Sequence, residues 1–359
     1  MIAETGCDFY ALYEAGYNVR HGFSVYEHDP SRVATPCHYS FRYWPSAALV
    51  GVPLSFLSPG VAYAAWIALI ELALFACLGA MYLLCDRRLT AFAPVAASWL
   101  MFSPLFLEWR LGQYSLMQAA LVTFAAFAYR TERPRAAAAS FAASLVWKLN
   151  TWIAAPALIR ARRFAPLIVA AIVLLVTGVP HFMRNAGSLQ AFLANLSVDG
   201  VGDENGFTRG NLGLAMLLKL LIGESFAPWM VQALFAACIG VGVVVTWRAR
   251  HLDLAEQLTF WLALSLAAYR HTWEHHYVMA LPALGMLLMR RRDAIVYLVA
   301  ALLALPTPYH LFRGDWTASH ELVYHAVKPV ALLALLVLIV GTKKARRPHS
   351  SQRLRRYLT

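Results

Sequence analysis

The chain has 359 residues, of which 60% are hydrophobic and only 14% are charged, and its mean hydropathy is +0.55. A soluble domain carries about a quarter charged residues, so this composition excludes a water-soluble globule of this length. Apolar stretches near the length needed to cross about 30 Å of hydrocarbon recur along the chain, at 61–84, 164–182, 230–247 and 322–340. The sequence therefore predicts an all-α, polytopic integral membrane protein.

The net charge of +12 comes from basic residues in short connectors between apolar stretches. These clusters lie at 86–88, 130–135, 160–163, 248–251 and 290–293, and the tail 343–356 is also basic. Connectors of this kind follow the positive-inside rule, by which Lys and Arg stay on the cytoplasmic side, and such a tail can contact anionic lipid head groups. We therefore expect these basic residues to contact membrane lipids and not nucleic acid.

With every basic cluster in the cytoplasm, the chain divides into three parts. Residues 1–44 form an extracytoplasmic N-terminal loop region, residues 45–341 form the membrane domain with an outside loop at 184–212, and residues 342–359 form a cytoplasmic tail. The domain then crosses the membrane in about nine or ten spans. A polar extracytoplasmic start without a signal peptide or a preceding span is unusual. We therefore also expect one more helix upstream in the natural protein, with Met1 as an internal methionine.

The segment 136–159 has the length of a single span, yet both of its flanks are basic. A single crossing would place one basic cluster outside and invert the topology of everything downstream. We expect instead two half-helices that enter the membrane and return, with a turn near Lys148. Broken helices are tolerated in a membrane only where they line an enclosed or wet cavity, and an ionisable group at depth is a functional hypothesis by default.

Ionisable and aromatic residues crowd the segments predicted to lie outside. Asp8 and Asp29 can be ordinary solvated loop charges, and the aromatic residues around them fit an interfacial belt. Adjacent histidines beside a carboxylate, as in 274–276, indicate either a metal site or acid–base chemistry. Neighbouring residues on a helix point about 100° apart, so His275 and His276 favour hydrogen bonding or neutralisation of an anion. We find no Cys/His spacing typical of zinc and expect no metal.

The order of several short motifs resembles glycosyltransferase family 87, the polyprenol-phosphate-mannose-dependent α-mannosyltransferases of the GT-C membrane superfamily. The similarity extends from residue 8 to about residue 290. It is carried by Asp8, Phe9 and Tyr13, by Tyr26, by Phe41-Arg42-Tyr43-Trp44-Pro45, by Leu111-Gly112-Gln113, by Lys148 after a small-residue helix, by Gly210-Asn211, and by Trp273-Glu274-His275-His276.

This resemblance implies a GT-C-like helical bundle with its active site on the extracytoplasmic face of the cell membrane. The implied reaction moves a hexose, mannose in this family, from a polyprenyl-phosphate donor to a hydroxyl of a lipid or glycan acceptor, without a cofactor. Asp8 then takes the role of general base, with Glu274 and Asp29 as rivals. The candidates for binding the donor phosphate or substrate are Lys148, Arg209, His275, His276, Gln113 and Asn211, with Arg42 as a secondary candidate.

Two other functions stay open at this point, namely a transporter or flippase of lipid-linked sugars and a non-catalytic membrane homologue. A transporter is expected to repeat its hydropathy pattern in two halves and to carry ionisable residues at the midplane. We find no internal repeat, and the polar residues crowd one side. The sequence thus favours a transferase.

Two of the five cysteines, Cys7 and Cys37, fall in the N-terminal polar region. Both would face an oxidising compartment, in which disulfides form and persist. A disulfide beside Asp8 and two free thiols therefore both stay open for this pair.

Overall fold

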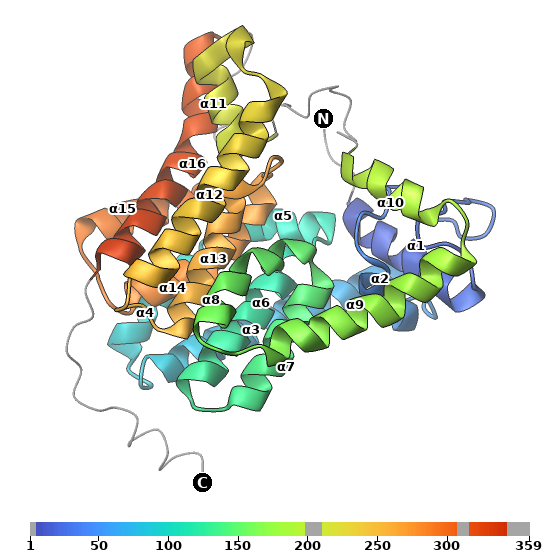
Figure 1. Cartoon of the computed structure of the whole chain (residues 1–359), viewed down its shortest axis with the longest axis horizontal. Coiled ribbons are helices and arrows are strands. Elements are labelled where there is room, and N and C mark those ends of the chain that lie inside the picture. The colour runs from blue at the N-terminus through green and yellow to red at the C-terminus, as the bar shows by residue number, and fades with distance from the viewer. Residues whose placement is uncertain (1–4, 198–209, 307–315, 343–359) are drawn as a thin grey trace.

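The computed structural model describes residues 5–197, 210–306 and 316–342, and the regular elements in these ranges are all helical (Figure 1). The first half contains α1 (Cys7–His21), α2 (Pro45–Leu54), α3 (Pro59–Leu84), α4 (Leu89–Leu100), α5 (Pro104–Leu111), α6 (Ser115–Arg130), α7 (Pro134–Trp147), η1 (Leu149–Ala154) and α8 (Ala155–Arg160). The second half contains α9 (Ala165–Arg184), α10 (Ser188–Ser197), α11 (Leu214–Ile222), η2 (Gly223–Ser225), α12 (Pro228–Arg248), α13 (Leu254–Ala268), η3 (Glu274–Ala280), α14 (Leu281–Leu288), α15 (Ala294–Ala304) and α16 (Ala318–Gly341). The expected all-α class is confirmed.

Four helices in the described ranges are long and apolar enough to cross a membrane, namely α3, α9, α12 and α16. They coincide with the four apolar stretches that the sequence singles out. Only 17% of the most apolar 18-residue stretch of α9 is buried by the rest of the protein, and the same share of α12 is buried. The apolar surfaces of these two helices are therefore available to lipid. A fifth span results if α4 and α5, which meet at an angle of 52°, together form one bent crossing.

Two other expected spans are short helices. α13 has 15 residues and α15 has 11, which corresponds to about 22 and 16 Å of helix, less than the hydrocarbon thickness of about 30 Å. Almost every residue of α13 is buried by neighbouring helices. The apolar side chains of α13 therefore contact other helices of the protein rather than lipid. The expected number of nine or ten spans is not confirmed.

The basic connectors gather at one end of the helical bundle. Arg130, at the end of α6, forms ion pairs with Asp253 and Glu256 at the start of α13. Arg290, which follows α14, forms an ion pair with the same Glu256. The sequence predicted that these connectors share one side, and the contacts place them together. Which side of the membrane this end faces stays a prediction.

The segment 136–159 is broken, as expected. α7 runs antiparallel to α6, since Ser140 donates to the carbonyl of Leu121 and Gln118 donates to the carbonyl of Ser144. Lys148 follows directly and reaches Ser115, the first residue of α6. The chain then returns through η1 and α8 to the basic end, where Arg160 donates to the carbonyl of Thr246 at the end of α12. The prediction that this segment is not one continuous helix is therefore confirmed.

The N-terminal region is a helix and a loop that are tied together. A disulfide joins Cys7 to Cys37, with the two Cα atoms 5.4 Å apart, so of the two open alternatives the structure has the disulfide and not two free thiols. α1 packs against α2 at Gly16 and Gly51, where a Cβ on Gly16 would lie 2.1 Å from the backbone of Gly51. Only glycine at position 16 allows this approach, which brings α1 against the bundle.

The arrangement of the bundle predicts how introduced cysteines will react in intact cells. With Cys77, Cys85 and Cys238 replaced by alanine, we expect Thr131→Cys and Arg162→Cys both to be protected from a membrane-impermeant maleimide until the membrane is permeabilised. Arg184→Cys, at the far end of α9, should react without permeabilisation. The reason is that residues 131 and 162 flank a segment that enters and returns, whereas α9 crosses. Reaction of Thr131→Cys from outside would contradict this topology.

Candidate active site

Asp8 lies in the first turn of α1, beside the disulfide, and faces the turn that follows α5. The amide N–H of Gly6 donates to the carbonyl of Arg110 at 2.8 Å, which fixes the start of α1 to the end of α5. Gly112 ends α5 with φ of +66°, and a Cβ there would lie 2.5 Å from the Cβ of Phe9. Glycine is thus required both for the left-handed backbone and for the close contact. The turn it makes brings the Gln113 side chain to the Asp8 carboxylate, to which it hydrogen-bonds.

The surroundings of Asp8 change its proton affinity. Burial raises the pKa of the Asp8 carboxyl to about 6 from an ordinary 3.8, although the Gln113 hydrogen bond and the charges of Lys148 and Arg42 act in the opposite direction. Burial disfavours the charged form of a carboxyl group because the surrounding protein solvates it less well than water. Asp8 is thus ionised at neutral pH and yet more basic than a solvated aspartate.

Lys148 lies at the tip of the returning segment and is buried there. Its Nζ donates to Ser115 Oγ at 3.2 Å and lies 5.7 and 5.9 Å from the ring centroids of Tyr43 and Tyr114. The Tyr114 hydroxyl in turn donates to the backbone carbonyl of Asp8. These contacts bring a cation from the α7–η1 turn and a carboxylate from α1 to the same end of the bundle.

A second carboxylate, Glu108 of α5, lies in the same cluster and is completely buried. Its Oε1 accepts a hydrogen bond from the amide of Leu116 at 2.8 Å, within the first turn of α6. The charge of Glu108 also interacts with those of Lys148 and Asp8. Glu108 therefore both holds the start of α6 and offsets the charge of Lys148.

The histidine motif is held by a buried asparagine. Asn211 accepts hydrogen bonds from the amides of Gly213 and Thr272 through its Oδ1 and donates to the carbonyl of Arg270 at 2.9 Å. It also forms the isolated bridge with Trp273, the one β-type pairing in the described ranges. Through these contacts the side chain of Asn211 holds the loop that leads into η3. Asn211 therefore positions this loop.

His275 and His276 begin η3, and their ring centroids are 4.3 Å apart in an edge-to-face arrangement. Nδ1 of His276 accepts a hydrogen bond from the amide of Trp273 at 3.1 Å, which leaves its Nε2 as the donor. His275 is buried, and its Nε2 has no hydrogen-bond partner within the described residues. Both rings lie within the range of the charge of Lys148. The free ring nitrogen of His275 is therefore available to a ligand beside that cation, whereas the ring of His276 also hydrogen-bonds the backbone of His271.

The remaining predicted residues lie in different places. Glu274 Oε1 is 3.8 Å from Nζ of the buried Lys328 and accepts a hydrogen bond from Ser103, so its contacts lie with α16 and α5. Asp29 accepts from Ser31 and pairs with Arg32 in the N-terminal loop, apart from the cluster around Asp8. Arg42 is exposed and close enough to act on Asp8. Arg209 lies outside the described residues.

Three residues of this cluster were not assigned to a site from the sequence, namely Glu108, Ser115 and Tyr114. Glu108 and Ser115 flank the Gly112-Gln113 turn, so this turn motif could have pointed to them in the sequence. Their roles depend on how α5 and α6 meet and on the return of α7, and neither feature is readable from the local pattern.

Residues 41–272, well over half of the chain, match the sequence profile of glycosyltransferase family 87. The matched range contains Gln113, Lys148 and Asn211, whereas Asp8 precedes it and the two histidines follow it. None of the curated proteins compared with the chain matches it. On the extent of the profile match, the chain belongs to glycosyltransferase family 87.

Proposed function

We propose that this membrane glycosyltransferase moves a hexose, most simply mannose, from a polyprenyl-phosphate donor to a hydroxyl of a lipid or glycan acceptor on the extracytoplasmic face. The observation that carries the proposal is the juxtaposition of the Asp8 carboxylate with the buried cation Lys148. Both lie at the end of the bundle opposite the basic connectors. A base for the acceptor and a cation for the leaving group thus meet in one place.

The reaction is a single displacement. Asp8 accepts the proton of the acceptor hydroxyl while the hydroxyl oxygen forms a bond to the anomeric carbon of the sugar. The bond between that carbon and the phosphate oxygen breaks, and its electron pair leaves with the polyprenyl phosphate. Attack opposite the leaving group inverts the anomeric centre. A hydroxyl is a weak nucleophile, so removal of its proton in the transition state lowers the barrier.

The leaving phosphate gains negative charge as the bond breaks, and preorganised donors are most effective where charge develops. Lys148 supplies a positive charge, and His275 and His276 supply ring nitrogens beside it. Gln113 orients Asp8 through a hydrogen bond. Asn211 holds the loop of the histidines, and Arg209 and Arg42 are candidates for contacts to the donor. Glu274 and Asp29 are placed less well as bases because their contacts lie elsewhere.

The proposed donor can be tested with the purified full chain and a panel of polyprenyl-phosphate sugars. We expect release of polyprenyl phosphate together with a glycosylated product, and mannose as the preferred sugar. Turnover with nucleotide sugars alone would contradict the proposed donor class. Binding of lipid-linked sugars with transfer across a vesicle membrane, but without cleavage, would indicate a transporter.

Replacement of Asp8 by asparagine tests the general base. The amide keeps the size of the side chain and can hydrogen-bond, but it cannot accept the proton, so turnover should fall by roughly two to four orders of magnitude. Donor binding should survive. Asp29→Asn is the matched control, because that loop carboxylate pairs with Arg32, and its turnover should stay near normal. Near-normal turnover of Asp8→Asn would refute the assignment.

Replacement of Lys148 by methionine tests the cation. Methionine fills the volume of the lysine stem without the charge, so donor affinity and turnover should both fall, because the phosphate loses a partner in the bound donor and in the transition state. Lys219→Met serves as the control, since Lys219 is a lysine on a different element, in the last turn of α11. Equal activity of the Lys148 and Lys219 variants would exclude Lys148 from donor binding.

The raised pKa of Asp8 predicts how activity depends on pH. A general base must be ionised, so kcat/KM should fall as pH drops through about 6, where an ordinary aspartate would still be ionised. Arg42→Gln removes a positive charge that lowers the pKa of Asp8, so its acid limb should move to higher pH. A pH–rate profile with a flat acid limb down to pH 4 would contradict Asp8 as the base.

A further inference from the structure

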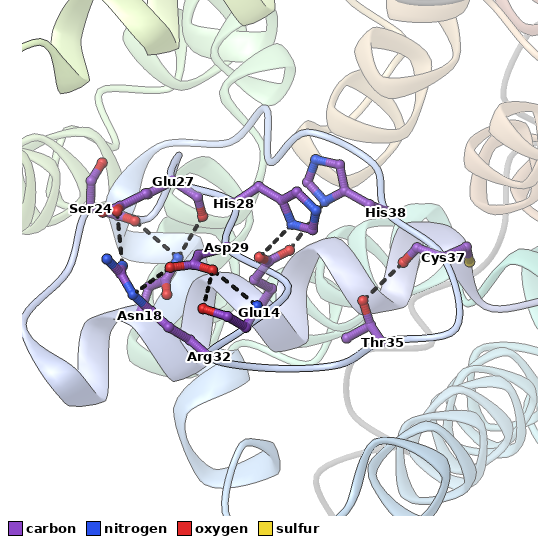
Figure 2. A network of polar contacts seen from close by, with 11 residues as sticks. Glu14, Asn18, Ser24, Glu27, His28, Asp29, Arg32, Thr35, Cys37 and His38 are labelled. Carbon is purple, nitrogen blue, oxygen red and sulfur yellow. Dashed lines mark hydrogen bonds and ion pairs between the residues drawn. The ribbon is translucent and has the colours of Figure 1, made fainter.

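A cluster of one carboxylate and two imidazoles lies between α1 and the N-terminal loop that follows it (Figure 2). Nδ1 of His28 is 2.7 Å from Oε1 of Glu14, and Nδ1 of His38 is 3.1 Å from Oε2 of the same residue. The two rings stack, with centroids 3.4 Å apart. Glu14 comes from α1 and has a side chain only 6% exposed, whereas the histidines come from the loop and are about a third exposed, at 34% and 35%.

The loop that presents the histidines is fixed on several sides. The Asn18 side chain donates to the carbonyls of Ser24 and Glu27, at 3.0 and 2.8 Å. Arg32 forms ion pairs with Glu27 and Asp29, as Figure 2 shows. The disulfide closes the loop one residue before His38. The two imidazoles are therefore held over Glu14 by a framework that does not depend on them.

We propose that Glu14, His28 and His38 bind one zinc ion. Two imidazole nitrogens and a carboxylate oxygen are a recurrent zinc donor set, in which water takes the fourth position. All three ligand atoms lie within 4.8 Å of one another. Ligand atoms about 2.0 Å from a tetrahedral zinc are about 3.3 Å apart, so the observed spacings need only small changes. Because both rings are partly exposed, rotations of their side chains supply these changes without movement of the backbone.

Hydrogen bonding alone explains this arrangement less well. One histidine is enough to neutralise a buried carboxylate, and a second positive imidazole stacked on the first would repel it. A divalent ion balances the charge of Glu14 with both imidazoles neutral, which is the form that binds metal. Imidazole and carboxylate together also suit zinc better than magnesium, which prefers oxygen ligands.

No metal site was expected from the sequence, because the ligands follow no standard spacing. Glu14 precedes His28 by 14 residues and His38 by 24. Only the disulfide and the fold of the loop bring them together. This metal site is separate from the residues of the proposed reaction. A measurement of zinc binding therefore does not depend on which sugar is transferred. Zinc there would fasten the loop to the helix that carries Asp8.

The test uses the full chain, purified in detergent through a tag without histidines, dialysed against ZnCl₂ and then against metal-free buffer. We expect one zinc ion per chain by elemental analysis and a rise of a few degrees in Tm with added ZnCl₂, but no rise with MgCl₂. In the double variant His28→Gln/His38→Gln, the amides can still donate to Glu14 but bind zinc poorly. This variant should fold, lose the bound zinc and lose the shift in Tm.

His21→Gln is the matched control, since His21 is an exposed histidine at the end of the same helix. It should keep both the zinc and the shift. Single His38→Gln should already lower zinc retention at least tenfold, which covers the case in which the double variant folds poorly. Equal zinc content in the wild type and the double variant would overturn the proposal, as would equal loss in His21→Gln, which would indicate adventitious binding to surface histidines.

Discussion

The burial of Lys148 at the tip of a returning segment constrains the rest of this protein. An ammonium group that is removed from water needs anionic or polar partners nearby, because an isolated buried charge costs too much free energy. The bundle supplies them from three directions, with Glu108 from α5, Ser115 from α6 and Asp8 from α1. The aromatic faces of Tyr43 and Tyr114 complete the surroundings. The same set of groups that makes the cation tolerable also provides a base and an anion site.

The sequence was most informative where a physical rule acts along the chain. Basic flanks on both sides of 136–159 were enough to predict a segment that returns, and the antiparallel contacts of α6 with α7 agree with it. The number of spans was less predictable, because a helix such as α13 is apolar for contact with protein rather than lipid. Hydropathy does not separate these two surroundings. The match to glycosyltransferase family 87 supports the order of the motifs, but not the roles of individual residues.

The site was predictable in its types of residue and less so in their contacts. Asp8, Gln113, Lys148 and the two histidines were all singled out from short motifs, and they come together at one end of the bundle. Asn211 was expected to contact a substrate, yet its side chain is occupied by the backbone of the histidine loop. That distinction needs the positions of backbone amides, which only the folded chain defines. Glu108 was overlooked for the same reason, since its partner is the amide of Leu116.

The first loop shows how a surface element can affect the chemistry. Its disulfide closes a loop of about 30 residues, which in a chain-entropy estimate restricts the unfolded state by about 3–4 kcal/mol. Cys7 is the neighbour of Asp8, so the same bond fixes the start of the helix that carries the base. A base contributes fully only when it is held in a productive geometry, and an error of about 1 Å can cost a hundredfold in rate. Gly112 and Gly16 set the position of α1 through close packing, and a zinc ion on Glu14 would add a further anchor somewhat less than two turns along the helix from Asp8. The placement of Asp8 thus depends on contacts that extend well beyond the residues touching the substrate.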